Sequence, residues 1–117
     1  MDTFTILMLI VAIVLNALAN ILIKASAIYS NDETIIGLIT NPWLISGLIS
    51  FGLAFVFYRY VLSKGLPLSI AYPLMTTTGF AIVIIASRIF FNERLVLIQW
   101  LGIGFIVLGI WLIASKI

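Results

Sequence analysis

The chain has 117 residues, of which 64% are hydrophobic and 9% charged, and its mean hydropathy is +1.33. In a soluble domain about a quarter of all residues are charged. A chain this apolar has too few polar side chains to cover a water-facing surface, so we expect it to lie in membrane lipid. A net charge of +2 without a basic run argues against a nucleic-acid partner, and the lack of cysteine and histidine excludes disulfides and makes a metal site improbable.

Four apolar segments are long enough to cross a membrane, which takes about 20 residues. We predict spans over residues 4–23, 43–62, 68–89 and 95–114, within a single all-α domain over residues 1–117. The first segment lacks a positively charged leader and is too long for the core of a signal peptide, so we expect it to be retained as a helix.

The connections carry the turn and capping signals. Residues 35–40 are too short to cross and are expected to lie along the interface. Asn41 is a good helix cap, Pro42 suits a first helical position, and Trp43 prefers the level of the lipid head groups. We therefore expect the second span to begin cleanly at this tripeptide.

Every carboxylate lies at or outside the end of a predicted span. These residues are Asp2, Asp32, Glu33 and Glu93. Glu93 is interpreted as a residue of the first turn of the last helix, where the helix dipole favours a negative charge. The hydrocarbon region then holds no acidic group and no histidine, so a proton relay through carboxylates has no support.

The basic residues are balanced between the two sides of the membrane. One side would hold Arg59, Lys64 and Lys116, and the other Lys24, Arg88 and Arg94. Because an asymmetry of Lys and Arg normally sets orientation, this balance permits insertion in both directions and an antiparallel homodimer. The alternative is that one marginal charge, or the insertion machinery, still selects a single orientation.

The last span offers a surface for such a dimer. Gly102 and Gly109 are seven residues apart and share one helix face, where small residues allow close approach of a second helix. The alternative is that these glycines pack within the chain.

Polar residues inside the spans are costly and therefore informative. Asn16, Asn20 and Lys24 follow one another at intervals of four, which places them on one face of the first helix, expected to face the bundle interior. This face is a candidate substrate surface. The alternative is hydrogen bonding between helices, with Lys24 reaching to the interface.

The second and third spans add further candidates. Tyr72 and Thr76 flank Pro73, which is expected to kink the third helix, and Ser46 is a hydroxyl on the second span. Pro73 together with Gly79 would give this helix a hinge, although a static kink fits the same pattern. We assign Tyr72, Thr76 and Ser46 to the substrate site beside the first helix.

Several segments in register resemble the small multidrug resistance family, within the drug/metabolite transporter superfamily. The similar segments are Leu15–Lys24, Leu66–Tyr72, Phe90–Leu95 and the Gly102/Gly109 pair. The resemblance implies an antiparallel dimer of the bacterial inner membrane that alternates access to its two sides. Proton-coupled exporters of this family carry a glutamate eight residues before the first-helix lysine, whereas Asn16 stands here and cannot exchange a proton.

Residues Ala71–Leu74 are more similar to the branch that includes subunits flipping undecaprenyl-phosphate-linked aminoarabinose. This favours a transporter of an amphipathic or lipid-linked substrate. One alternative is an exporter of organic cations without the usual glutamate, and a second is a non-transporting subunit or heterodimer partner. An enzyme is the least favoured reading, because no nucleophile with its base, no metal ligands and no nucleotide loop are found, and no cofactor is expected.

Overall fold

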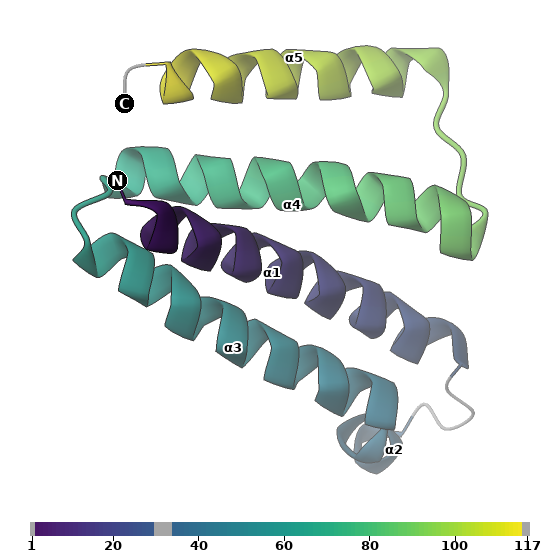
Figure 1. Cartoon of the computed structure of the whole chain (residues 1–117). Helices are drawn as coiled ribbons and strands as arrows, with labels where there is room; N and C mark the ends of the chain where they lie inside the picture. The colour runs from purple at the N-terminus through teal and green to yellow at the C-terminus, as the bar shows by residue number, and fades with distance from the viewer. Residues whose placement is uncertain (1, 30–33, 116–117) are drawn as a thin grey trace.

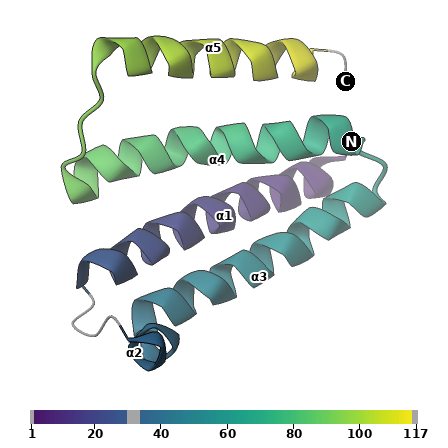
Figure 2. The same ribbon diagram turned by 180° about the vertical axis from the view of Figure 1, so that it is seen from behind.

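The computed structural model describes residues 2–29 and 34–115, and these are helical apart from short connections. The helices are α1 (Thr3–Tyr29), α2 (Ile35–Thr40), α3 (Pro42–Ser63), α4 (Leu68–Phe91) and α5 (Leu97–Ala114). The four long helices lie in a row in the order α3, α1, α4, α5, and the short α2 sits at the start of α3 (Figures 1 and 2). The molecule measures 47 × 36 × 20 Å, so the row is a flattened layer.

Successive long helices run back and forth across this layer. α1 and α4 point in one direction, and α3 and α5 point in the other (Figure 1). One side of the layer therefore holds the start of α1, the turn between α3 and α4 and the end of α5 (Figures 1 and 2). This is the alternation that four consecutive membrane crossings require.

Two helix starts follow from local hydrogen bonding. The Asn41 side-chain oxygen accepts the backbone N–H groups of Trp43 at 2.9 Å and Leu44 at 3.4 Å, and Pro42 opens α3. This confirms the predicted start of the second long helix. At the start of α1, the Asp2 carboxylate accepts the Thr5 N–H at 2.8 Å, and hydrogen bonding to Thr5 lowers the pKa of Asp2 below its usual value.

The helix ends differ in part from the predicted spans. α1 continues past residue 23, through Lys24 to Tyr29, and α5 begins at Leu97 instead of residue 95. α4 remains one helix of 24 residues across Pro73, so the proline does not break it. Among the described helices, α1, α3 and α4 are long and apolar enough to span a membrane, while α5, with 18 residues, is a shorter apolar helix.

The core forms where α1 lies between α3 and α4. Small residues there let the backbones approach, and Ala12, Ala54 and Ala71 are fully buried. Gly47 of α3 lies close to the backbone of α1, because a Cβ atom on it would lie 3.2 Å from the carbonyl oxygen of Ala19. Such close contact between small residues is how helices associate in lipid.

Within the described residues the single chain encloses no central space, so the expectation that the polar face of α1 lines a bundle interior stays a prediction. The helices form an open row, so the face of α1 that carries Asn16, Asn20 and Lys24 looks onto an open groove. Asn16 is half-buried, and Asn20 and Lys24 are exposed. In α1, α3 and α4, only 17–28% of the most apolar 18-residue stretch is buried, which is too little for a closed bundle.

α5 forms the loose edge of the row. Its contacts are chiefly with α4, and most of its large apolar side chains are exposed, including Leu97 (76%), Phe105 (73%) and Trp111 (64%). In lipid this exposure carries no penalty, because the hydrocarbon solvent is itself apolar.

Candidate functional site: a groove along α4

A small cavity of about 220 Å³ lies between α1 and α4. Asn16 and Asn20 line it from α1, and Thr76 and Gly79 line it from α4. Hydrogen bonds within the helices orient two of these side chains: Asn20 Nδ2 donates to the Asn16 carbonyl oxygen at 2.9 Å, and the Thr76 hydroxyl donates to the Tyr72 carbonyl oxygen at 2.9 Å. Phe80 and Val83 complete the walls, so uncharged hydrogen-bonding groups share this cavity with apolar side chains.

The absence of a side chain at Gly79 makes room for the Asn16 carboxamide. A Cβ atom at Gly79 would lie 3.2 Å from Asn16 Nδ2, which is tight contact. Within the described part of the chain, the Asn16 carboxamide has no hydrogen-bond partner of its own. Its donor and acceptor are therefore available to a molecule in the cavity.

A second cavity, of about 160 Å³, continues from Asn20 toward the connection between α4 and α5. At this end the Lys24 Nζ atom lies 3.2 Å from Glu93 Oε1, and about half of each side chain is exposed. Ser87 of α4 also lines the cavity. The ion pair ties α1 to the connection that follows α4.

The position of Glu93 corrects the interpretation that placed it in the first turn of the last helix. α5 starts only at Leu97, and Glu93 lies in the preceding connection. Asn92 ends α4 in the left-handed region, with φ of 54°, and the Glu93 N–H then donates to the Ser87 carbonyl oxygen at 3.2 Å. This turn directs Glu93 to Lys24.

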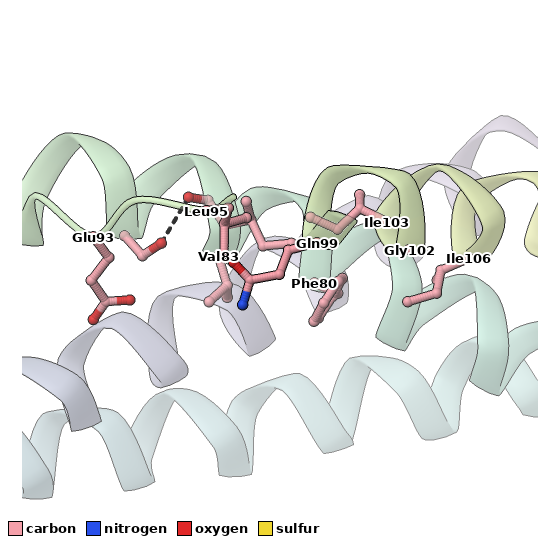
Figure 3. A pocket seen from close by; sticks show the side chains of 10 residues that line it. Phe80, Val83, Glu93, Leu95, Gln99, Gly102, Ile103 and Ile106 are labelled. Atoms are coloured by element: carbon pink, nitrogen blue, oxygen red, sulfur yellow. Dashed lines mark hydrogen bonds between the residues drawn. The ribbon is translucent and has the colours of Figure 1, made fainter. Parts of the chain in front are cut away.

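A third and larger cavity, of about 410 Å³, separates α4 from α5, and most of its walls are apolar. Figure 3 shows Phe80, Val83 and Gln99 converging on it, with Glu93 at one end and Ile106 at the other. Gln99 Oε1 accepts the Val96 N–H at 2.9 Å, which leaves the amide nitrogen free of partners among the described residues.

These three cavities adjoin one another along one side of α4. Val83 lines all three, Asn20 lines the first two, and Glu93 lines the last two. We call this continuous surface the α4 groove. It combines a neutral polar section at Asn16, a charged section at Lys24 and an apolar section between α4 and α5.

The structure gathers most of the predicted site residues in the α4 groove. Asn16, Asn20, Lys24, Thr76 and Gly79 all line it. Their binding role, like the hinge role of Pro73 and Gly79, stays a prediction.

Two predicted residues lie elsewhere. Ser46 is exposed on α3, on the far side of α1, and its hydroxyl donates to the Pro42 carbonyl oxygen at 2.8 Å. Tyr72 is 59% exposed and does not line the three cavities of the groove. Their assignment to a substrate site also stays a prediction.

The paired glycines of α5 have open space around them. A Cβ atom on Gly102 or Gly109 would meet nothing within 4 Å, although Gly102 lines the cavity between α4 and α5. Tight packing of these glycines within the chain, the alternative left open by the sequence, therefore has no support.

Three polar residues of the groove were missed by sequence reasoning: Ser87, Glu93 and Gln99. Gln99 offered a usable signal, because it is an amide just inside a predicted span, where polar groups are costly. Ser87 carried the same kind of signal, as a hydroxyl inside the predicted span 68–89, whereas Glu93 had none, since its role depends on the turn at Asn92 and on the position of α1.

Comparison with known proteins identifies the family. The sequence model described as Small Multidrug Resistance protein matches residues 4–106 of this chain. The chain belongs to this family. Proteins named "Probable 4-amino-4-deoxy-L-arabinose-phosphoundecaprenol flippase subunit ArnE" are similar to this chain. The one from Aeromonas salmonicida is 39% identical over 75 residues, and the one from Aeromonas hydrophila is 37% identical over 75 residues.

The matched region covers 64% of this chain and 64% of each of these two relatives. A protein from Sinorhizobium fredii named y4nH, described as uncharacterized, is 34% identical over 74 residues, which is 63% of this chain and 62% of its own. No solved structure matches.

These findings confirm the resemblance to the family and to the flippase-subunit branch. Together with the apolar helices, they indicate that the chain is a multi-pass integral membrane protein of the bacterial inner membrane. The names of the Aeromonas relatives describe flippase subunits and no enzyme.

Proposed function

We propose that this protein is a small transporter that carries the head group of a polyprenyl-phosphate-linked sugar across the membrane. The observation that supports this function best is the composition of the α4 groove. Asn16, Asn20 and Thr76 line the cavity between α1 and α4, Phe80 lines both this cavity and the adjoining one, and Ile103 and Ile106 line the adjoining cavity between α4 and α5. An amphipathic substrate likewise has a polar head group that is followed by an apolar chain.

The polar section suits a sugar. The Asn16 carboxamide offers two donors and one acceptor that the described residues leave unused, and a sugar hydroxyl is both donor and acceptor. In the low-dielectric membrane interior, neutral hydrogen-bonding groups avoid the cost of burying a charge.

The apolar section suits the lipid chain. Moving each CH₂ group of the chain into water would cost about 0.8 kcal/mol, so a long polyprenyl tail remains in hydrocarbon while the head group crosses. Phe80, Ile84, Ile103 and Ile106 line a cavity along which the first units of that tail would lie.

We further propose that two chains work together as an antiparallel dimer. One chain leaves the α4 groove open along the row, so a second chain is needed to enclose a head group. The exposed α5 face and the open space at Gly102 and Gly109 support contact through this edge. Because the Aeromonas relatives are named as subunits, a different partner chain is the alternative outcome.

Asn16 also bears on the energy source. It lines the neutral section and does not titrate, so proton exchange at this position contributes nothing to coupling. An exporter of organic cations is the competing function. It would require another coupling group or no coupling, and proton release on ligand binding in detergent would favour a coupled exporter.

The test measures binding of a polyprenyl-phosphate sugar to the purified protein and its movement across reconstituted vesicles. We expect saturable binding to the native protein and about 10-fold weaker binding to Asn16→Ala, because hydrogen bonds to the head group are lost. Ser63→Ala is the control, since this exposed hydroxyl donates to the Tyr60 carbonyl oxygen outside the groove. Failure of the native protein to bind any polyprenyl phosphate would overturn the proposal.

A further inference from the structure

A fourth cavity, of about 300 Å³, lies where the end of α1 meets the start of α3 and the end of α4, and we call it the outer cavity. We infer that the outer cavity binds one acyl chain of a membrane phospholipid, at a site separate from the α4 groove. This inference concerns another surface of the molecule and does not depend on the proposed function.

One end of the outer cavity is surrounded by aromatic rings. The end of α1, the start of α3 and the end of α4 lie on the same side of the layer (Figure 1). They contribute Tyr29, Trp43, Phe90 and Phe91 to the lining, and the Tyr29 and Trp43 ring centroids are 5.7 Å apart. Because tryptophan and tyrosine prefer the level of the lipid head groups, this end of the cavity is expected at that level.

The outer cavity continues from the aromatic rings along α1. Leu18, Ile21 and Ala25 line this part, and Leu18 lies 11 residues before Tyr29, which is about 16 Å along a helix. The hydrocarbon of one leaflet is about 15 Å deep, half of the full core. The cavity therefore has the length and the direction of an acyl chain that starts at the head groups and follows the helix inward.

The outer cavity and the α4 groove lie on opposite sides of α1. Successive residues turn by about 100° around a helix, so Leu18 lies about 160° from Asn20, and Ala25 lies about 180° from Asn16. Ile21 and Phe91 line both the outer cavity and the section of the groove at Lys24, so they stand between the two. A molecule in the groove therefore leaves the outer cavity free for a lipid.

The chemistry of the lining suits a hydrocarbon chain. The lining side chains are all aliphatic or aromatic, and their only polar atoms are the Tyr29 hydroxyl and the Trp43 indole nitrogen. A polar ligand would find few hydrogen-bond partners there. In lipid, association depends on van der Waals contact more than on removal of apolar surface from water, and a narrow cavity with several rings offers such contact to a chain.

The charges near this end of the layer balance. Lys24 and Glu93 form an ion pair, and beyond it the sequence has two arginines, Arg88 and Arg94, against two carboxylates in the connection before α2. We therefore expect the acyl chain, and not the charge of the head group, to determine binding.

The experiment uses Trp43 as a fluorescent reporter. The full-length protein with Trp100→Phe and Trp111→Phe keeps Trp43 as its single tryptophan. In detergent micelles it is titrated with phosphatidylcholine that carries bromine atoms on its chains, which quench a tryptophan in contact with them. We expect quenching that saturates at a low fraction of lipid. Quenching in simple proportion to the lipid fraction would overturn the inference.

A second single-tryptophan protein gives the background from lipid around the whole molecule. Trp43→Phe combined with Trp100→Phe keeps Trp111, which is 64% exposed on α5 and lines none of the four cavities. Its quenching should follow the lipid fraction without saturation. The same saturating curve in both proteins would show that Trp43 reports ordinary surface lipid, and this would contradict a built site.

Two variants assign the binding to the outer cavity. Phe90→Ala removes an exposed ring of its lining and should weaken binding about 5-fold, whereas Phe105→Ala, an equally exposed ring on α5 outside the four cavities, should leave it unchanged. Ala25→Leu fills the cavity from α1 and should abolish the saturable phase, with thermal unfolding as the check on its fold. If Ala25→Leu fails to fold, the comparison of Phe90→Ala with Phe105→Ala decides, and equal affinities there would exclude the outer cavity.

Competition with unlabelled lipids identifies the occupant. Phosphatidylcholine with chains of half the length should compete about 10-fold more weakly, and phosphatidylglycerol of full length should compete within about 3-fold of phosphatidylcholine. A 10-fold preference for either head group, or equal competition by a rigid polycyclic lipid, would refute the assignment to an acyl chain. Stronger competition by a polyprenyl phosphate would assign the cavity to the tail of the proposed substrate instead. Failure of the inference in these assays leaves the proposed function intact, because that function is tested by variants of the groove.

Discussion

The two outer helices of the row are held in opposite ways. α3 lies against α1 at close range, where a Cβ atom on Gly47 would meet Ile23 Cγ1 at 3.0 Å and the Ala19 carbonyl oxygen at 3.2 Å. α5 lies against α4 across a cavity of about 410 Å³, and a Cβ atom on Gly102 would meet nothing within 4 Å. Glycine thus allows helix contact at one edge and leaves a surface open at the other.

The difference indicates that the α1–α3 contact supports the fold, whereas the α4–α5 side is available for binding. Helix association in lipid depends on close packing, because burial of apolar side chains yields little when the solvent is apolar. The α1–α3 contact, where small residues meet at close range, is therefore expected to stabilise the single chain. The α4–α5 side, with its groove and exposed edge, is left for ligand and partner.

Gly47→Leu should give the largest effect, because the new side chain collides with the Ala19 backbone and with Ile23. We expect a loss of about 3 kcal/mol or more in the free energy of unfolding, measured by denaturation in mixed micelles. Gly52→Leu, on the same helix but with nothing within 4 Å of the added Cβ, is the control and should change little. Equal losses in both variants would contradict the distinction between the two edges.

Gly102→Leu combined with Gly109→Leu tests the open edge. The single chain has room for these side chains, so helix content and thermal unfolding should remain unchanged. A dimer that contacts through this face should dissociate at least 10-fold more readily, as measured by cross-linking or light scattering in detergent. Gly104→Leu is the matched control, because it is equally open but lies on another face of α5. A dimer equally stable in all three proteins would exclude this face as the interface.

Gly79→Ala should give the smallest change, and it tests the groove itself. The added methyl group would lie 3.2 Å from Asn16 Nδ2, so the carboxamide must shift by a few tenths of an ångström. We expect a 3- to 10-fold loss in affinity for a polyprenyl-phosphate sugar (about 0.7 to 1.4 kcal/mol) and less than about 1 kcal/mol of lost stability. Gly52→Ala serves as the control. Unchanged affinity in Gly79→Ala would show that Asn16 does not contact the head group.

Local patterns predicted local structure well. The start of α3 at Asn41 and Pro42 was confirmed, because capping depends on residues two or three positions apart. The i, i+4, i+8 spacing likewise predicted that Asn16, Asn20 and Lys24 share one helix face, and these residues line two adjoining cavities. The start of α5 was predicted two residues early, since residues 95 and 96 are as apolar as the helix that follows.

Contacts between segments far apart in the chain could not be predicted from the sequence. Glu93 was assigned to the first turn of a helix because the helix dipole favours a carboxylate there. In the structure its partner is instead Lys24, contributed by α1. Ser46 and Asn16 were grouped by polarity alone, and the order of helices in the row places α1 between α3 and the groove.

From composition and spacing alone, this chain is an all-helical membrane protein with a neutral polar face on its first helix, since hydropathy and helical period are properties of consecutive residues. The tertiary structure decided which faces meet. It set the open row, the close approach at Gly47 and Gly79, and the ion pair at the end of the α4 groove. The physical reason is that lipid gives no strong preference for which apolar faces associate, so fine differences in side-chain shape select the neighbours.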